Sequence, residues 1–256
     1  MNWCSQCINR TALSALLCLV LCVVPQLVGA QLNVAVDERK SGTHFLSQQL
    51  QELQNDPDKN PVQLWVLRGH NLWQAQCASC HAAITTMRQA VASYPKLSAA
   101  GKLINLEDQI QNHPAHLTPV SKPLSNDEVL ALSAALHHAA KGERIQTAIL
   151  EPYYTRGQEL YNQRMGRINL ACIHCHDQKV GTNMRGDVIS QAQPTGFPIY
   201  RQSWQTLGTL ERRLRACYSG VQAPLPAMGS AELRDLELFL KVRARGMTIE
   251  GPSIRR

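Results

Sequence analysis

The sequence predicts an all-α protein built from two tandem copies of one small helical domain. Three features of its 256 residues occur twice and in the same order. RGHNLW at 68–73 recurs as RGQELY at 156–161, and a Cys-x-x-Cys-His motif follows each, CASCH at 77–81 and CIHCH at 172–176. An amphipathic helical pattern then closes each copy. This internal repeat indicates two equivalent domains.

Each copy is predicted to begin with a helix that carries a close-packing glycine and an aromatic side chain one turn later. After the motif, an extended stretch rich in Gly and Pro leads to a short helix. That helix is expected from the Leu–Glu pair at 106–107 to His113, and from the Leu–Glu pair at 210–211 to Cys217. The equal spacing places His113 and Cys217 at equivalent positions in the two copies.

The closing helices are expected over 127–140 and 231–245, where leucines recur at helical spacing. Ser125 is the predicted N-cap of the first helix and forms a capping box with Glu128. Ser230 is the predicted N-cap of the second.

The N-terminus reads as a secretory signal peptide over residues 1–30. Arg10 precedes an apolar run at 12–24, and Val28–Gly29–Ala30 has the small residues of a cleavage site. The apolar run is too short to predict a membrane span, so no stable span is expected after cleavage. Export predicts a periplasmic protein.

The mature chain is predicted to divide into 31–147, with the first motif, and 148–256, with the second. Of nine cysteines, four leave with the signal peptide. Four of the remaining five belong to the two motifs, which leaves Cys217 without a disulfide partner.

The charge balance is mildly basic, with 26 Lys and Arg residues, one of them in the signal peptide, against 19 Asp and Glu. This excess suits solubility or attraction for small anions. The basic residues do not alternate with aromatic ones, so no nucleic-acid partner is expected.

The two Cys-x-x-Cys-His motifs predict two covalently bound haem c groups. Both thiols of such a motif add to the haem vinyl groups, and the histidine binds the iron from the proximal side. A zinc site or a redox-active cysteine pair is the alternative. The proximal ligands are then His81 and His176, and two tandem class I cytochrome c domains follow. The predicted haem-attaching cysteines are Cys77, Cys80, Cys172 and Cys175.

Two residues compete for the distal position of the second haem. Cys217 lies on a basic helix, with Arg213 four residues before it on the same face. The arginine and ferric iron both favour the thiolate, which is the form that binds iron and attacks sulfur. Met228 precedes the last helix, which is a common position for a distal methionine. The positions of the two residues in the sequence favour Cys217 over Met228 as the distal ligand.

The first haem has two histidine candidates for its distal side. The repeat places His113 opposite Cys217, and His116 follows closely. Two histidine ligands would leave this iron no open position, which suits electron transfer or a structural role. Both histidines could instead lie at the surface. His137 and His138 lie on the closing helix and are not expected to bind iron.

The sequence resembles the SoxA family of SoxAX cytochromes. The segments that carry the resemblance are YPK at 94–96, GKLINLE at 101–107 and RLRAC at 213–217, together with the second motif. The similarity extends over essentially the whole mature chain.

The resemblance implies an L-cysteine S-thiosulfotransferase of periplasmic sulfur oxidation. Such a protein pairs with the cytochrome SoxX and joins thiosulfate oxidatively to a cysteine of SoxY, within the SoxYZ carrier. The products are a cysteine S-thiosulfonate and two electrons. The resemblance implies that Cys217 is the distal ligand and active-site cysteine, which can be a persulfide, and that Arg213 lies beside it. Diheme members commonly have cysteine where this chain has His113.

Two other functions remain open on the sequence. A diheme cytochrome that only transfers electrons would have histidine and methionine ligands. A thiosulfate dehydrogenase, which makes tetrathionate, also uses a cysteine-ligated haem but needs no carrier protein.

Overall fold

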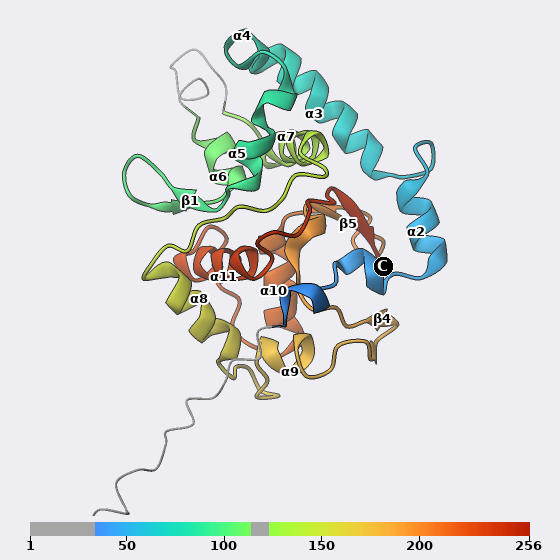
Figure 1. Cartoon of the computed structure of the whole chain (residues 1–256), viewed down its shortest axis with the longest axis vertical. Helices are drawn as coiled ribbons and strands as arrows, with labels where there is room; N and C mark the ends of the chain where they lie inside the picture. The colour runs from blue at the N-terminus through green and yellow to red at the C-terminus, as the bar shows by residue number, and fades with distance from the viewer. Residues whose placement is uncertain (1–33, 114–122) are drawn as a thin grey trace, which may run out of the picture. The chain divides into compact units, whose positions relative to one another are not determined.

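The repeat predicted from the sequence is present as two helix pairs that pack in the same way. In a computed structural model that describes residues 34–113 and 123–256, α3 (Val62–Gln76) packs against α7 (Asn126–Ala139), and α8 (Tyr153–Asn162) packs against α11 (Ala231–Arg243) (Figure 1). The predicted signal peptide and His116 lie outside the described residues.

Glycine makes both helix crossings possible. A Cβ atom on Gly69 would overlap the carbonyl oxygen of Ala131, and one on Gly157 would overlap that of Asp235. The backbones therefore approach more closely than any side chain would allow. This confirms the predicted close-packing role of the two glycines in the repeated segments.

The elements between the paired helices are short. In the first copy they are α4 (Ala78–His81), η3 (Ile84–Met87), α5 (Arg88–Ala92), β1 (Lys96–Leu97), β2 (Leu103–Ile104) and α6 (Leu106–Gln111). In the second copy they are α9 (Cys172–His176), β3 (Asn183–Met184), β4 (Asp187–Val188), η5 (Pro194–Gly196), β5 (Ile199–Arg201), β6 (Thr206–Gly208) and α10 (Leu210–Gly220).

The closing helices begin where their caps predict. The Ser125 side chain accepts from the Glu128 backbone N–H, and the Glu128 carboxylate accepts from the Ser125 N–H, so the predicted capping box is present. Ser230 caps α11 by accepting from the Leu233 N–H. α11 ends two residues before the predicted position, at Arg243.

The all-α prediction is confirmed, although the structure adds short strands. The three-stranded sheet has the order β6-β5-β7, with β6 antiparallel to β5 and β7 (Ser253–Arg255) parallel to it. The last strand therefore comes from the C-terminal end of the chain and pairs with a strand about fifty residues earlier.

The segment before α3 wraps over the second copy. It contains η1 (Val36–Glu38), η2 (Gly42–Phe45) and α2 (Gln48–Asn55). The Arg39 side chain donates to the carbonyl oxygens of Arg243 and Arg245 at 2.6 and 2.9 Å. Sequence position assigns this segment to the first domain, but its contacts are with the second.

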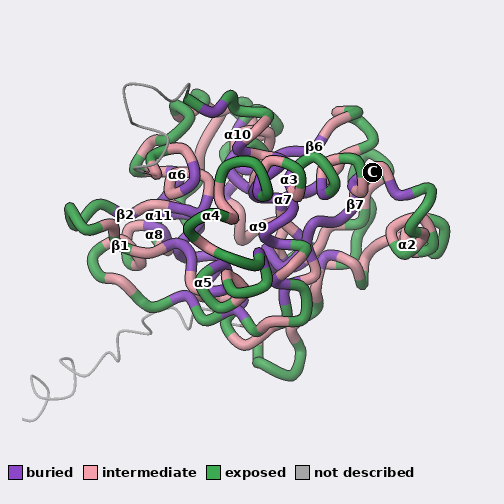
Figure 2. Tube along the Cα trace, turned by 90° about the horizontal axis from the view of Figure 1, so that it is seen from above, coloured by how far each residue is buried: buried purple, intermediate pink, exposed green. Residues whose placement is uncertain are grey.

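Residues 34–256 form one compact unit. The chain after α7 pairs with the chain after α11, since the N–H of Gly246 donates to Ile145 and that of Ile145 donates to Met247, both at 2.9 Å. Figure 2 shows the buried residues gathered along α7 and α11, while α2 has none. The boundary near residue 148 stays a prediction, and it lies in the extended stretch between α7 and α8.

Candidate functional site

The second motif forms the short helix α9, and its histidine is held in one tautomer. Nδ1 of His176 lies 2.7 Å from the carbonyl oxygen of Ser190. A carbonyl oxygen only accepts, so Nδ1 carries the proton and Nε2 keeps its lone pair. A backbone carbonyl on the far nitrogen is the usual way in which a protein orients a metal-binding imidazole.

Cys217 of α10 faces this histidine from the other side. Burial by itself would raise the pKa of the Cys217 thiol, but the charge of Arg213, the neighbouring His176 and the charge of Arg201 bring that pKa down to about 7. Because Arg213 lies one helical turn before Cys217, its charge reaches the sulfur directly. The arrangement favours a thiolate opposite the imidazole.

The motif cysteines lie close to the same sulfur. Burial and, to a smaller extent, the neighbouring Cys217 raise the pKa of Cys172 to about 12. Burial and Cys217 also raise the pKa of Cys175. Three sulfur atoms and one imidazole therefore converge on one region at the edge of an apolar cluster. The buried members of that cluster are Tyr161, Leu210, Leu214, Tyr218, Leu233, Leu236, Phe239 and Leu240.

This region fits a haem c. The motif cysteines can form the thioethers, His176 offers a free Nε2, and Cys217 offers a sulfur on the opposite side. Within the described residues, no three His, Cys, Asp or Glu side chains are grouped to hold a metal ion by themselves. A haem iron takes only its two axial ligands from the protein, so two facing side chains are enough.

The alternative distal ligand, Met228, points to solvent. Its side chain is 54% exposed. Cys217, in contrast, lies next to the motif histidine His176. The geometry therefore favours Cys217 over Met228.

The first motif also brings two histidines together. The ring centroids of His81 and His113 lie 5.5 Å apart at an angle of 70°. Metal–imidazole bonds of about 2 Å place two rings on one metal with centroids roughly 6 Å apart. The pair thus fits the two axial positions of a haem whose thioethers come from Cys77 and Cys80. Trp73 packs against His81 at 5.9 Å and donates its indole N–H to the carbonyl oxygen of Ala82.

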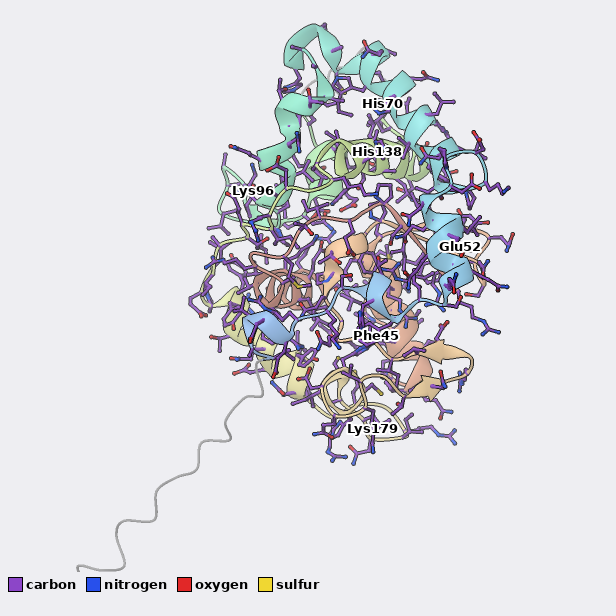
Figure 3. The ribbon with its side chains drawn as sticks, turned by 45° about the vertical axis from the view of Figure 1, so that its right-hand side comes forward. Phe45, Glu52, His70, Lys96, His138 and Lys179 are labelled. Atoms are coloured by element: carbon purple, nitrogen blue, oxygen red, sulfur yellow. The ribbon has the colours of Figure 1, made fainter. Side chains whose placement is uncertain are left out.

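The two histidines of the closing helix serve other contacts. His137 is buried and donates from Nδ1 to the Ser133 carbonyl oxygen at 2.9 Å. His138 lies beside His70 of α3, with ring centroids 6.4 Å apart (Figure 3). That these two histidines do not bind iron stays a prediction.

Several residues near the second motif were missed by the sequence reasoning. Asp177 follows the motif histidine directly and accepts from the Tyr161 hydroxyl and from the Arg243 guanidinium, both at 2.8 Å. This network ties α9 to α8 and α11. The adjacency of Asp177 to the motif was the one available signal, because its partners come from distant helices.

Arg201 of β5 is a second cation that acts on Cys217. Its guanidinium donates to the Asp187 carboxylate at 2.8 Å and lies 5.6 Å from the ring centroid of Trp204. By contrast, Arg212 stacks on Trp204 at 4.3 Å, and Arg215 donates to the Pro226 carbonyl oxygen at 2.9 Å. Of the three arginines closest to Cys217 on α10, Arg213 is the one whose charge acts on the thiol.

None of the helices in the described part of the chain has the length and apolar character that a membrane span requires.

The comparisons with known proteins agree with this geometry. The family described as SoxA/TsdA, cytochrome c domain, matches residues 68–145 and 156–249, which are the two copies of the repeat. The chain is 33% identical over 233 residues to the L-cysteine S-thiosulfotransferase subunit SoxA of Pseudaminobacter salicylatoxidans, covering 86% of this chain and 82% of the relative. The SoxA subunit of Paracoccus pantotrophus is 29% identical over 227 residues, with 84% and 78% covered.

The fold agrees as well. A chain in the crystal structure of SoxXA from P. pantotrophus superposes with a TM-score of 0.78 at 29% identity, covering 85% of this chain and 87% of that one. The match of both repeat copies, and the similarity to SoxA relatives over most of the length, lead to one conclusion. The chain belongs to the SoxA/TsdA family of cytochrome c domains.

Proposed function

We propose that this chain is an L-cysteine S-thiosulfotransferase of the SoxA type, which joins thiosulfate to a cysteine of the carrier protein SoxY within SoxYZ. The observation that carries the proposal is the Cys217 thiol, which faces His176 and is acted on by the positive charge of Arg213. A cysteine held in its thiolate form beside a cation is suited to bind and activate an anionic sulfur compound.

The chain binds two haem c groups in this proposal. The first is held by Cys77 and Cys80, with His81 and His113 on the iron. The second is held by Cys172 and Cys175, with His176 and Cys217 on the iron. Haem c supplies the one-electron acceptor that oxidation of sulfur to a disulfide-level product requires. The second site is catalytic, and the first relays electrons or supports the fold.

The reaction proceeds in two steps. The Cys217 thiolate, or its persulfide, forms a sulfur–sulfur bond with the outer sulfur of thiosulfate, and the two electrons released pass one at a time to the partner cytochrome SoxX. The thiolate of the SoxY cysteine then attacks that outer sulfur, and the Cys217 sulfur departs with the electron pair of the broken bond. The carrier thus gains an S-thiosulfonate, loses its thiol proton to solvent, and Cys217 is regenerated.

Arg213 binds the sulfonate oxygens and stabilises negative charge as it shifts between the sulfur atoms. Guanidinium groups suit this role because their N–H fork matches oxyanions in geometry. Arg201, on strand β5, adds a second positive charge that acts on the Cys217 sulfur.

The chain works with SoxX as a heterodimer in the periplasm in this proposal. The fold match to SoxXA supports the SoxX partner. The signal peptide predicted over residues 1–30 supports export.

The test is an assay of thiosulfate conjugation to SoxYZ by the purified complex, with mass measurement of the carrier. Cys217→Ala is expected to abolish the thiosulfonate adduct, because no sulfur remains to hold thiosulfate. Met228→Leu is the control and is expected to retain the adduct and the absorption spectrum. Full activity of the Cys217→Ala variant would contradict the proposal.

Thiosulfate dehydrogenase is the second candidate, since the matching family covers TsdA as well as SoxA. That activity needs no carrier, so tetrathionate would form from thiosulfate and an electron acceptor alone. We expect no tetrathionate without SoxYZ.

A further inference from the structure

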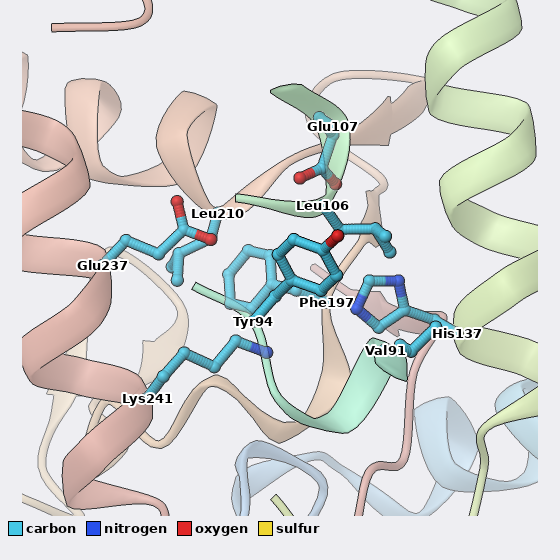
Figure 4. Close-up of a pocket in the computed structure, with 9 residues that line it drawn as sticks. All are labelled: Val91, Tyr94, Leu106, Glu107, His137, Phe197, Leu210, Glu237 and Lys241. Carbon is cyan, nitrogen blue, oxygen red and sulfur yellow. The ribbon is translucent and has the colours of Figure 1, made fainter. Parts of the chain in front are cut away.

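A cavity of about 20 Å³ lies between α7 and α11, far from solvent for most of its lining. That volume is enough for one water molecule. Glu237 and Lys241 extend into it from α11, His137 from α7 and Glu107 from α6 (Figure 4). Ionisable groups rarely line an internal cavity unless each has a partner.

Glu237 is the most deeply placed carboxyl group of this cavity. It is 5% exposed. Its Oε2 accepts from the Asn105 side-chain amide at 3.1 Å and lies 3.7 Å from a guanidinium nitrogen of Arg234. One good hydrogen bond and one long ion pair satisfy an ionised carboxylate incompletely.

Arg234 is shared among three carboxyl groups. It makes a bidentate pair with Asp108 at 2.6 and 2.8 Å and a further contact with Glu211 at 3.1 Å. Lys241, the other cation, donates to the Pro194 carbonyl oxygen at 3.4 Å. His137 is neutral, because burial lowers its pKa to about 3. The charged and titratable groups around Glu237 are Tyr94, Glu107, Asp108, His137, Glu211, Arg234 and Lys241.

The buried cluster therefore has more acids than bases. Four carboxyl groups surround two cations. If every group were ionised, the cluster would carry two uncompensated negative charges, with Glu211 and Glu237 buried and Glu107 and Asp108 half-buried, which is costly. One bound proton relieves half of this excess. Burial and the neighbouring Glu107 together raise the pKa of Glu237 to about 7, against the opposing effects of Arg234, Asn105 and Lys241.

The cluster also joins the two helices that lead to the predicted distal ligands. Asp108 belongs to α6, which runs toward His113, and Glu211 belongs to α10, which carries Cys217. Arg234 bridges the two carboxylates. Six residues separate Glu211 from Cys217, a helical rise of about 9 Å.

From this arrangement we propose that the cavity between α7 and α11 is a proton-binding site coupled to haem reduction, with Glu237 as the group that takes up the proton. Each electron that converts ferric to ferrous haem adds one negative charge. A proton from solvent then converts the Glu237 carboxylate to the acid, entering past the half-buried Glu107 and Asp108. The inference requires haem c but not thiosulfate chemistry.

As a scale for the coupling, one added unit charge at roughly 12 Å, at an effective protein dielectric of about 20, changes a proton affinity about tenfold. Reduction should therefore raise the pKa of Glu237 by about one unit. Proton uptake on reduction should reach about half a proton per electron near pH 7.5 and disappear well below pH 6 and well above pH 9.

The experiment uses the haem-loaded protein in weakly buffered solution. A pH-indicator dye measures proton uptake while the haem is reduced electrochemically, and the midpoint potential of the haem is recorded across this pH range. In wild type the potential should fall as pH rises through 7 and 8. Glu237→Gln keeps the volume and the acceptor for Asn105 and should lose most of the uptake. Glu159→Gln, on the exposed side of α8, is the matched control and should behave as wild type.

A second variant tests in which direction the pH-dependent step moves. Lys241→Met removes a charge that holds the pKa of Glu237 down, so the pH-dependent step should move to higher pH. If Glu237→Gln does not fold, infrared difference spectra of wild type labelled with ¹³C-glutamate should show a protonated carboxyl band that appears on reduction. Unchanged proton uptake in Glu237→Gln, a shift to lower pH in Lys241→Met, or no labelled carboxyl band would each overturn the proposal.

Discussion

The two residues that occupy equivalent positions in the repeat have different surroundings. His113 stacks near His81, whereas Cys217 lies under the positive charge of Arg213 and Arg201. A pair of imidazoles closes both sides of an iron with neutral ligands. A thiolate between an imidazole and a guanidinium keeps a reactive sulfur in place. The difference in residue type therefore assigns the two sites different roles in the proposed function.

The role proposed for the Arg213 side chain can be tested by measuring the activity of a variant. Arg213→Gln should lower kcat/KM for thiosulfate conjugation about a hundredfold, because one oriented cationic donor to a reacting oxyanion contributes roughly this much. Arg212→Gln is the control, since Arg212 stacks on Trp204 instead. Steady-state assays with SoxYZ measure both, and equal rates for the two variants would contradict the role given to Arg213.

At the scale of elements, α9 is held from outside by a network that joins three helices. Asp177, at the end of the motif, is paired with Arg243 of α11 and Tyr161 of α8, and the side chains of Asp177 and Arg243 are each 6% exposed. A five-residue helix has no stability of its own. These contacts therefore position the motif histidine.

Removing the charge of Asp177 should be strongly destabilising. Asp177→Asn leaves the buried Arg243 guanidinium without its counter-charge, and we expect a loss of about 3–5 kcal/mol in the free energy of unfolding. Asp187→Asn, in an ion pair whose carboxylate is 38% exposed, should cost less than about 1 kcal/mol. Denaturant titration of both variants gives the comparison, and similar losses would show that the Asp177 network is not what stabilises α9.

The helix crossings give a second prediction about elements. Gly157→Ala should destabilise the protein by about 2 kcal/mol or more, because the added methyl group overlaps the Asp235 backbone and lies 2.8 Å from Cβ of Phe239. Gly220→Ala, in α10 with no atom within 4 Å of the new Cβ, should be neutral or gain up to about 1 kcal/mol. Thermal unfolding of the two variants checks this, and a tolerated Gly157→Ala would mean that α8 and α11 can move apart.

At the scale of the whole molecule, the two copies share cores instead of folding side by side as independent units. One apolar cluster combines Val62 and Val66 of α3 with Leu207 and Ile254 of the sheet in the second copy. The Asp108–Arg234–Glu211 bridge adds a buried polar connection. Rearranging either copy would expose both kinds of contact, so we expect the described chain to unfold as one unit.

The buried carboxyl group of Glu237 makes the stability of the folded protein depend on pH. The folded protein binds the Glu237 proton more tightly than the unfolded chain does, because burial raises the pKa of that carboxyl from 4.5 to about 7. Its stabilising contribution is therefore complete below pH 4.5 and is lost as pH rises through 7. Glu237→Gln lacks this dependence and should gain stability relative to wild type between pH 5 and pH 8. Parallel unfolding curves at these two pH values measure the difference, and an unchanged or reversed difference would contradict the raised pKa.

The fold was largely predictable where its signals are local. The closing helices start within one residue of prediction, because Ser125 and Ser230 are strong caps followed by periodic leucines. The short helices α6 and α10 begin at the predicted Leu106 and Leu210. The three-stranded sheet was not predicted, since its strands are three residues long and β7 pairs with β5 only through tertiary packing.

The candidate site was predictable in its covalent part and less so in its surroundings. The spacing of the two Cys-x-x-Cys-His motifs predicted which cysteines and histidines lie close together in each copy of the repeat. Asp177 and Arg201 carry no local signal, because their partners lie on other elements. Glu237 and Lys241 carry no local signal of burial either, yet α11 is covered on several sides and both are buried.

The sequence by itself determined the repeat, the helices and the residue types placed at each Cys-x-x-Cys-His motif, because spacing and periodicity are local properties of the chain. Only the tertiary structure decided which side chains face one another. It set His176 against Cys217, turned Met228 to solvent, and gathered four carboxyl groups, two of them buried, around two cations. The physical reason is that burial and charge pairing depend on atoms brought together from distant positions, and these interactions control protonation and reactivity.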